Sequence, residues 1–317
     1  MIDTRELVDP QLLPFLDALP GGAVNRHTLP ARRERSDALI LAQLPDDLPV
    51  LVEEQYLSGP TGPASLRILK IQRHDLADKA PALLHCHGGG LVMGKPESSL
   101  PTLRHMAMTL GVVIVSVDYR LAPEAPYPAA IDDCYAALEW MHDNAKALRI
   151  DSQCIGVTGE SAGGNLAAAL CLMARDRAGP PIAYQNLVYP MLDDRADATD
   201  NPVVGQFCWT RESNRFAWNA YLGATAHDAV SPYAAPARES DYERLPPLYL
   251  STGALDLFLD ENIRFVQALA AAGVAVEVDI YPGAFHAFDV APDADVSIRA
   301  RARRLDAMRR AIDGVGD

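Results

Sequence analysis

The five residues from Gly159 to Gly163, Gly-Glu-Ser-Ala-Gly, restrict the fold of this chain more than any other feature of its sequence. They follow CIGVT, an apolar run of strand length, and they open a run that predicts a helix from about Ala162 to Arg175. A strand that reverses directly into a helix holds its central residue in a strained backbone, and glycine two positions away on either side permits close approach of neighbouring chains. We therefore expect Ser161 to present its hydroxyl at the carboxyl edge of a sheet.

The rest of the chain predicts the sheet that this turn requires. From about Ser65 onward, apolar runs of strand length alternate with helix-like runs, which is typical of a mostly parallel sheet with helices on both faces. At 317 residues, of which 49% are hydrophobic, the chain is long enough for one large core. We expect a single α/β domain that spans residues 1–317.

Two segments lie outside this alternation and are predicted to form a small helical cap. Residues 1–60 consist of short helical pieces broken by prolines, with no strand alternation. Residues 193–236 form an insertion that we expect to pack on the N-terminal segment. It carries six aromatic side chains: Phe207, Trp209, Phe216, Trp218, Tyr221 and Tyr233. Direct contact with a substrate and closure of a local core explain them equally well.

Charge and composition exclude several classes of function. Asp and Glu outnumber Lys and Arg by 42 to 28, and no stretch gathers the basic residues of a nucleic-acid-binding surface. The one arginine-rich segment, from Arg299 to Arg310, alternates with apolar residues as the solvated face of an amphipathic helix does. No run of about 18 apolar residues predicts a membrane span, and the acidic N-terminus lacks the basic start of a signal peptide.

Cysteine usage agrees with a reducing compartment. The five cysteines are an odd number, widely scattered, and several lie in apolar runs; they are Cys86, Cys134, Cys154, Cys171 and Cys208. We expect them to be reduced and buried, and the protein to be cytoplasmic.

A serine hydroxyl needs an aligned base to act as a nucleophile, normally a histidine oriented by a carboxylate. Of the eight histidines, only His286 lies C-terminal to residue 227, and it follows the strand-length run AVEVDIY. It also fits the usual chain order of serine, acid and histidine in this architecture. We therefore predict that His286 is the base.

The carboxylate is expected in the loop after another strand-length run, LYLSTG at 248–253. Asp256 lies nearest the end of that run and is the preferred candidate. Asp260 and Glu261 are the rivals, but they begin a predicted helix, where the helix dipole alone accounts for acidic residues.

Consecutive glycines at 88–90 follow the strand-length run ALLHC and His87. Such residues leave backbone N–H groups free to turn toward an oxyanion, so Gly88 and Gly89, together with Ala162 at the helix start, are predicted to form an oxyanion hole. His85 and His87 flank a cysteine and suggest a metal site, but no third ligand cluster is evident in the sequence.

In combination, these residues resemble the bacterial hormone-sensitive-lipase-like family of α/β-hydrolase carboxylesterases. The resemblance extends over about residues 81–289 and includes HGGG at 87–90, DYRLAPE at 118–124, GESAGG at 159–164, SPYAAP at 231–236, LDLFLDE at 255–261 and GAFHAF at 283–288. It implies an α/β-hydrolase fold with a small helical cap. It also implies the roles already assigned: Ser161 as nucleophile, Asp256 and His286 as its partners, and Gly88, Gly89 and Ala162 as oxyanion donors. No cofactor or metal is implied.

Two residues depart from the family pattern. Glu160 stands where the family more often has Asp, and Ala287 stands where it more often has Gly. Neither touches the reacting atoms, so we expect activity to survive. In the family, Tyr119 and Arg120 look like supports for the oxyanion loop, and plain packing explains them equally well.

The resemblance implies a serine hydrolase that cleaves short- to medium-chain acyl esters of small molecules through an acyl-enzyme. A lipase, a lactonase, a deacetylase of a specific small molecule or an amidase are alternatives, because the same groups cleave all of these substrates. Plant hormone receptors resemble the family but lack the histidine, so the presence of His286 argues against a non-catalytic receptor. Edge-strand dimers are common in the family, and a homodimer is therefore expected.

Overall fold

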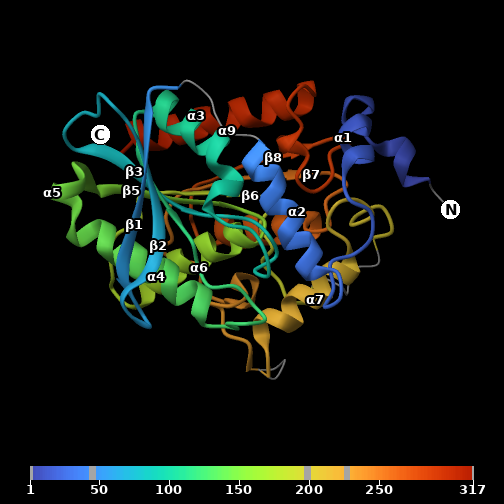
Figure 1. Ribbon diagram of the computed structural model, residues 1–317, viewed down its shortest axis with the longest axis horizontal. Coiled ribbons are helices and arrows are strands. Elements are labelled where there is room, and N and C mark those ends of the chain that lie inside the picture. The colour runs from blue at the N-terminus through green and yellow to red at the C-terminus, as the bar shows by residue number, and fades with distance from the viewer. Residues whose placement is uncertain (1–2, 43–47, 196–200, 225–228, 316–317) are drawn as a thin grey trace.

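An eight-stranded sheet forms the centre of the molecule (Figure 1). The computed structural model describes residues 3–42, 48–195, 201–224 and 229–315, with side chains throughout these ranges except at 36–42. The strand order is β1-β2-β4-β3-β5-β6-β7-β8, with antiparallel pairing of β2 to β1 and β4 and parallel pairing elsewhere. The strands are β1 (Val50–Gly59), β2 (Gly62–Arg73), β3 (Ala80–Cys86), β4 (Val113–Val117), β5 (Ile150–Glu160), β6 (Gln185–Val188), β7 (Leu248–Gly253) and β8 (Val276–Tyr281). The predicted mostly parallel sheet is confirmed.

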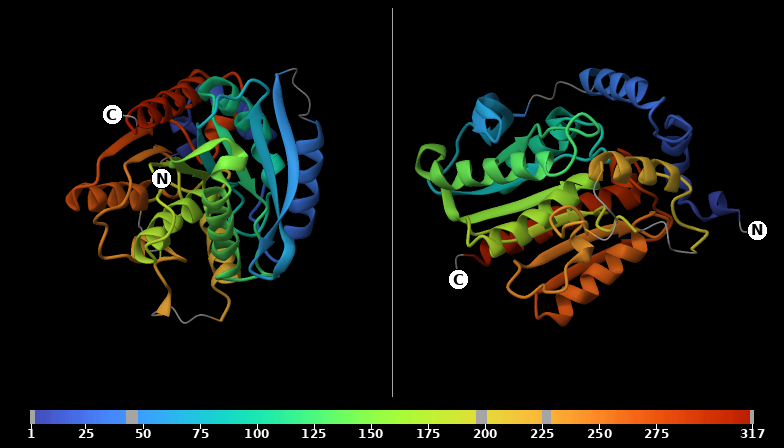
Figure 2. Two further views of the ribbon diagram at one scale, coloured as in Figure 1. Left: turned by 90° about the vertical axis from the view of Figure 1, so that its left-hand side faces the viewer. Right: turned by 90° about the horizontal axis from the view of Figure 1, so that it is seen from below.

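Helices cover both faces of this sheet (Figure 2). The helices of the described ranges, those of the cap included, are α1 (Leu13–Ala18), α2 (Leu29–Ala42), α3 (Leu100–Leu110), α4 (Ala129–Asp143), α5 (Ala145–Leu148), α6 (Ala162–Asp176), α7 (Arg211–Leu222), α8 (Leu259–Ala271) and α9 (Asp295–Asp313). One hydrophobic cluster joins α3 and α9 to one face of the sheet, and a larger one joins α4, α6 and α8 to the other. The predicted α/β-hydrolase architecture is therefore present.

Alternate residues of the inner strands enter these two clusters. Leu83 of β3 lies in the cluster under α3 and α9, whereas Leu84 lies in the cluster under α4 and α6, and both are fully buried. A strand buried on both faces reads as a continuous apolar run, which explains the composition of β3 and of β4. None of the helices in the described ranges is long and apolar enough to cross a membrane.

The cap differs in extent from the sequence prediction. Helices α1 and α2 of the N-terminal segment and α7 of the insertion lie at the same end of the molecule in Figure 1, and the Val24 N–H donates to Ser213 Oγ at 2.9 Å. Residues 50–59, however, form strand β1 and not cap. β1 is an edge strand with mostly exposed or half-exposed side chains, so its sequence lacks the apolar alternation that indicates a strand. Within the insertion, residues 196–200 and 225–228 lie outside the described ranges.

Two predictions about single side chains are wrong. Cys208 is exposed, because it lies in a loop, whereas the other four cysteines are buried; all five are free. Arg304 is only 4% exposed, although the arginine-rich segment of α9 was expected to be a solvated face. Its neighbours Arg303 and Arg309 are exposed, whereas the guanidinium of Arg304 binds buried side chains of the sheet.

Candidate active site

The turn at Ser161 has the strained geometry that its sequence predicts. β5 ends at Glu160, α6 begins at Ala162, and Ser161 between them has φ 56° and ψ −118°. The Ser161 N–H donates to Val188 O at 2.9 Å, and the Met191 N–H donates to Ser161 O at 3.1 Å, so both sides of its backbone are held. A Cβ atom on Gly163 would overlap the carbonyl oxygen of Cys86, and this close approach excludes a side chain there.

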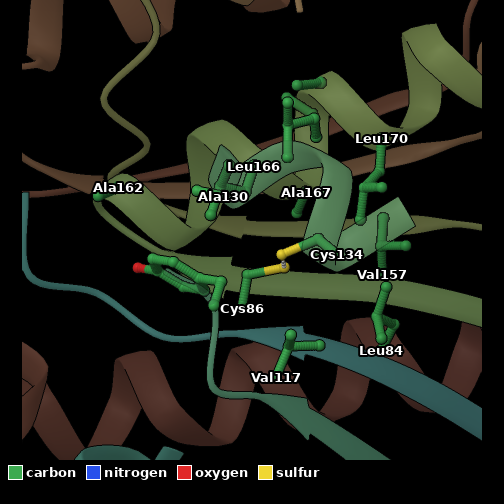
Figure 3. Packing of buried hydrophobic residues seen from close by; sticks show 14 of the residues in the cluster. Leu84, Cys86, Val117, Ala130, Cys134, Val157, Ala162, Leu166, Ala167 and Leu170 are labelled. Atoms are coloured by element: carbon green, nitrogen blue, oxygen red, sulfur yellow. Dashed lines mark hydrogen bonds between the residues drawn. The ribbon is translucent and has the colours of Figure 1, made fainter. Parts of the chain in front are cut away.

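The core beneath this turn is apolar and tightly packed. Figure 3 shows Cys86 at the end of β3 facing Cys134 of α4, beside buried residues of α6, and the two sulfur atoms lie 3.6 Å apart. Leu166 of α6 is fully buried in the same cluster. The start of α6 is therefore supported from below and is fixed relative to the end of β3.

Three side chains from separate loops meet at the carboxyl edge of the sheet. His286 Nε2 lies 2.9 Å from Ser161 Oγ, and His286 Nδ1 lies 2.8 Å from Asp256 Oδ2. The exposed fractions are 6% for Ser161, 5% for His286 and 0% for Asp256, so water competes little for these bonds. A carboxylate only accepts, so Nδ1 carries the proton and Nε2 is left to accept from the serine hydroxyl.

The two rival carboxylates occupy other positions. Asp256 follows β7 directly, and its second oxygen accepts from the Phe258 N–H at 2.9 Å, which fixes the carboxylate. Asp260 lies in the first turn of α8. Glu261 Oε1 accepts from the Leu192 N–H at 2.6 Å, and burial raises the pKa of Glu261 well above its usual range. Of the three, Asp256 is the one bonded to the imidazole.

The loop after β3 lies directly against the serine turn. Gly88 packs on the carbonyl oxygen of Glu160, where an added Cβ would come within 3.1 Å. Ala162 is the first residue of α6, so its N–H has no partner inside the helix. Gly88 therefore lies against the residue before Ser161, and Ala162 is the residue after it. The role of Gly88, Gly89 and Ala162 as oxyanion donors stays a prediction.

His87 and Tyr119 support this loop from within. Their rings stack at 4.1 Å between centroids, and Tyr119 Oη donates to His87 O at 2.7 Å. His87 Nδ1 donates to Gly88 O at 2.8 Å, and burial lowers the pKa of His87 to about 4, so the ring stays neutral near pH 7. Arg120 does not share this role, because its side chain binds Asp133 of α4.

The metal site considered for His85 and His87 is not supported. His85 Nδ1 lies 2.8 Å from Ser116 Oγ, and its Nε2 lies 3.0 Å from Glu160 Oε2, so both ring nitrogens have protein partners. The described part of the chain contains no group of three or more His, Cys, Asp or Glu side chains that could hold a metal ion.

Aromatic rings surround His286, and the sequence did not predict this arrangement. Ring centroids lie 4.6 Å away for Tyr189, 5.3 Å for Phe258 and 6.4 Å for Trp209. The indole of Trp209 also fills the space next to Gly90, because a Cβ there would overlap the ring. The three rings come from separate loops with no shared spacing. Tyr189 and Phe258 follow strands β6 and β7, whereas Trp209 lies in the insertion, where the sequence carries no local signal for it.

The aromatic residues of the insertion divide between the two interpretations that the sequence left open. Trp209 lies beside His286, with ring centroids 6.4 Å apart. Phe207 packs on Phe285, the residue before His286, with ring centroids 6.0 Å apart. The rings of Trp218 and Tyr221 lie 6.1 Å apart between centroids, and both residues are buried in the main hydrophobic cluster.

Comparison with known proteins agrees with the geometry. A family described as alpha/beta hydrolase fold matches residues 83–290. The chain is 35% identical to the esterase LipI of Mycobacterium tuberculosis over 98% of both chains, and 34% identical to the carboxylesterase NlhH of the same species over 97% of both. The solved structure of a bacterial heroin esterase matches with a TM-score of 0.92 at 40% identity, over 98% of this chain and 99% of that one. Since these relatives cover nearly the whole chain and are esterases, the protein belongs to the hormone-sensitive-lipase-like family of α/β-hydrolase-fold serine carboxylesterases.

Proposed function

We propose that this carboxylesterase hydrolyses short- to medium-chain acyl esters through an acyl-enzyme on Ser161. The observation that carries the proposal is the unbroken hydrogen-bonded chain from Ser161 Oγ through His286 to Asp256, buried and oriented at the end of three strands. Nucleophile, base and orienting acid in this order are the groups that acyl transfer requires.

Acylation follows from the protonation state of the imidazole. Ser161 Oγ attacks the ester carbonyl carbon while His286 Nε2 takes the hydroxyl proton, and Asp256 stabilises the imidazolium that forms. The carbonyl oxygen becomes an oxyanion, which accepts hydrogen bonds from the N–H groups of Gly88, Gly89 and Ala162. The carbon–oxygen bond to the alcohol then breaks, and the Nε2 proton goes to the leaving alkoxide.

Deacylation repeats these steps with water. His286 Nε2 takes a proton from a water molecule, whose oxygen attacks the acyl carbon, and the proton then returns to Ser161 Oγ as the carboxylic acid leaves. The proton acceptor and donor in both half-reactions is His286 Nε2, so His286 has to be neutral at the start of each half-reaction.

The size of the acyl group follows from the walls of the site. Trp209 stands against Gly90 of the proposed oxyanion loop and close to His286, which restricts the space beside the reacting carbon. The cap helix α1 has only six residues, and the relatives are esterases, one of them a heroin esterase. These features favour soluble esters over lipid droplets.

The test is a series of p-nitrophenyl esters from acetyl to palmitoyl, measured with wild type and Ser161→Ala side by side. We expect the highest kcat/KM at short to medium chains, and no turnover by the variant. A maximum at long chains with a jump in rate once the substrate forms an emulsion would establish a lipase. Full activity in Ser161→Ala would overturn the assignment of the nucleophile.

Assembly and compartment complete the proposal. Strand β8 is an edge of the sheet with Val278 and Ile280 exposed, and a homodimer would pair two such edges. The five free cysteines agree with a reducing, cytoplasmic setting. Light scattering on the purified protein at micromolar concentration tests the dimer, and a monomer mass would contradict it.

A further inference from the structure

A buried charged chain lies directly beneath the serine turn. Glu160, the residue before Ser161, has its carboxylate between two partners: Oε1 lies 2.7 Å from Arg304 Nη2 and Oε2 lies 3.0 Å from His85 Nε2. His85 continues the chain to Ser116 Oγ at 2.8 Å. His85 is fully buried, Arg304 is 4% exposed and the Glu160 side chain is 15% exposed, so the chain is largely removed from water.

The side chain of Arg304, on helix α9, also donates hydrogen bonds to two strands of the sheet. Its Nη2 also donates to Thr158 Oγ1 of β5 at 2.8 Å, and its Nε donates to Asn186 Oδ1 of β6 at 2.9 Å. The guanidinium therefore joins α9 to the two strands that flank the serine turn. A planar group with several donors in a fixed geometry holds its partners in one arrangement.

The charge of Glu160 depends on this environment. Burial by itself would raise the pKa of the Glu160 carboxyl, but the charge of Arg304 and the contact with His85 outweigh it and hold that pKa well below its usual range. Glu160 is therefore ionised at every pH at which the enzyme works. A buried ion pair of this kind contributes little net stability compared with apolar side chains of the same size, because both ions lose their hydration. Its presence at this position calls for another explanation.

The backbone of Glu160 contacts both Ser161 and the proposed oxyanion loop. Its carboxyl side is bonded to Ser161, whose φ of 56° is strained, and its carbonyl oxygen packs on Gly88 of the proposed oxyanion loop. The side chain is fixed by His85 from β3, the strand that leads into that loop. A rotation of Glu160 would therefore move Ser161 Oγ relative to the oxyanion donors.

We propose that Glu160 and Arg304 form a positioning pair, through which helix α9 sets the alignment of Ser161 with the oxyanion hole. The pair touches no reacting atom; it acts through the peptide that joins Glu160 to Ser161. The inference rests on the proposed roles of Ser161 and the oxyanion loop. Since a misplacement of about 1 Å costs on the order of 100-fold in rate, loss of either member is expected to lower kcat by about 10- to 100-fold.

The experiment compares Glu160→Gln, Arg304→Met and the double variant with both changes. Each single variant leaves one buried charge without its partner, so we expect a lower melting temperature together with the fall in kcat. The double variant buries no charge, and its melting temperature is expected to return toward that of wild type. Because the alignment is still lost, its kcat stays at least 10-fold low, with KM within about twofold of wild type.

The double variant separates positioning from stability even where a single variant fails to fold. A kcat that recovers together with the melting temperature would show that the pair is only structural and would overturn the proposal. A folded single variant with wild-type kcat would overturn it as well. The rate constant for inactivation by diethyl p-nitrophenyl phosphate, which also requires an aligned Ser161, is expected to fall in parallel with kcat.

Two control variants, Arg303→Met and Ser161→Ala, are measured in the same assays. Arg303→Met removes an exposed arginine of the same helix, bound to Glu277 and Asp279, and is expected to keep the kcat of wild type. Ser161→Ala on the same esters tests the proposed function separately. Activity in that variant would refute the role of Ser161, whereas its inactivity together with fast Glu160 and Arg304 variants would refute the positioning pair alone.

Discussion

An alanine at Gly89 tests the proposed oxyanion loop, because its Cβ atom would clash with the backbone of Met93. Gly89 has φ 124°, and a Cβ atom there would lie 2.6 Å from the carbonyl carbon of Met93 and closer still to its oxygen. The Met93 N–H donates to Gly89 O at 3.0 Å and the Val92 N–H donates to the same oxygen at 3.2 Å. The loop is a closed turn, so no side-chain rotation can relieve the clash and the turn itself has to open.

The expected cost of Gly89→Ala follows from what the turn holds. Opening it moves the N–H groups of Gly88 and Gly89 away from the oxyanion. Loss of one such donor typically lowers kcat by about 10²- to 10³-fold, or about 3 to 4 kcal/mol, so we expect at least a 100-fold fall in kcat.

Gly62→Ala is the matched control. Gly62 has a similar φ of 134°, but no atom lies within 4 Å of an added Cβ. Its alanine variant should therefore lose about 1 kcal/mol or more of stability through backbone strain alone, with unchanged kcat. Both variants are assayed for hydrolysis of p-nitrophenyl butyrate and for thermal unfolding. A Gly89→Ala enzyme with kcat within threefold of wild type would refute the role of this loop.

Asp256→Asn is expected to lower kcat on the order of 10⁴-fold, because the imidazole loses the acceptor that fixes its tautomer. Asp260→Asn is expected to keep kcat within twofold of wild type. Equal effects of the two substitutions on kcat would reject Asp256 as the acid. Burial lowers the pKa of His87 from 6.5 to about 4, so the unfolded chain binds a proton that the folded protein does not, and stability falls as the pH drops from 6.5 to 4. The free energy of unfolding is expected to fall by about 3 kcal/mol over this pH range. In His87→Gln, urea unfolding at several pH values should show no such fall. A pH dependence equal to that of wild type would contradict the buried neutral ring. Trp209→Ala removes the wall beside Gly90 and should shift kcat/KM from butanoyl toward octanoyl esters by about tenfold, and an unchanged chain-length profile would exclude Trp209 from the acyl site.

Local signals were enough to predict the sheet and the three residues that meet at its edge. The turn at Ser161 has a backbone requirement that only a few residue types meet, so its sequence specifies its structure. Asp256 and His286 follow strand-length runs in a fixed order, and parallel strands bring their carboxyl ends to one edge. Sequence order and strand topology together therefore placed the site.

The features that sequence analysis missed depend on contacts between distant segments. The side chain of Arg304 is buried among arginines that are mostly exposed, and only the approach of α9 to β5 and β6 gives it partners. Trp209 reaches His286 from an insertion with no periodic pattern. Strand β1 has few buried side chains, so its sequence lacks the apolar alternation that indicates a strand. Tertiary packing decides such positions, and single-sequence patterns do not record it.

Covalent labelling with diethyl p-nitrophenyl phosphate tests whether Ser161 is the nucleophile. The reagent transfers one diethylphosphoryl group to an activated serine and releases p-nitrophenol, so labelled protein can be digested and the modified peptide identified by mass spectrometry. We expect one group per chain, on Ser161, with activity lost in the same proportion, and no labelling of His286→Ala at the same reagent concentration. Labelling at another residue, or full esterase activity in a chain labelled at Ser161, would contradict the assignment of Ser161 as the nucleophile.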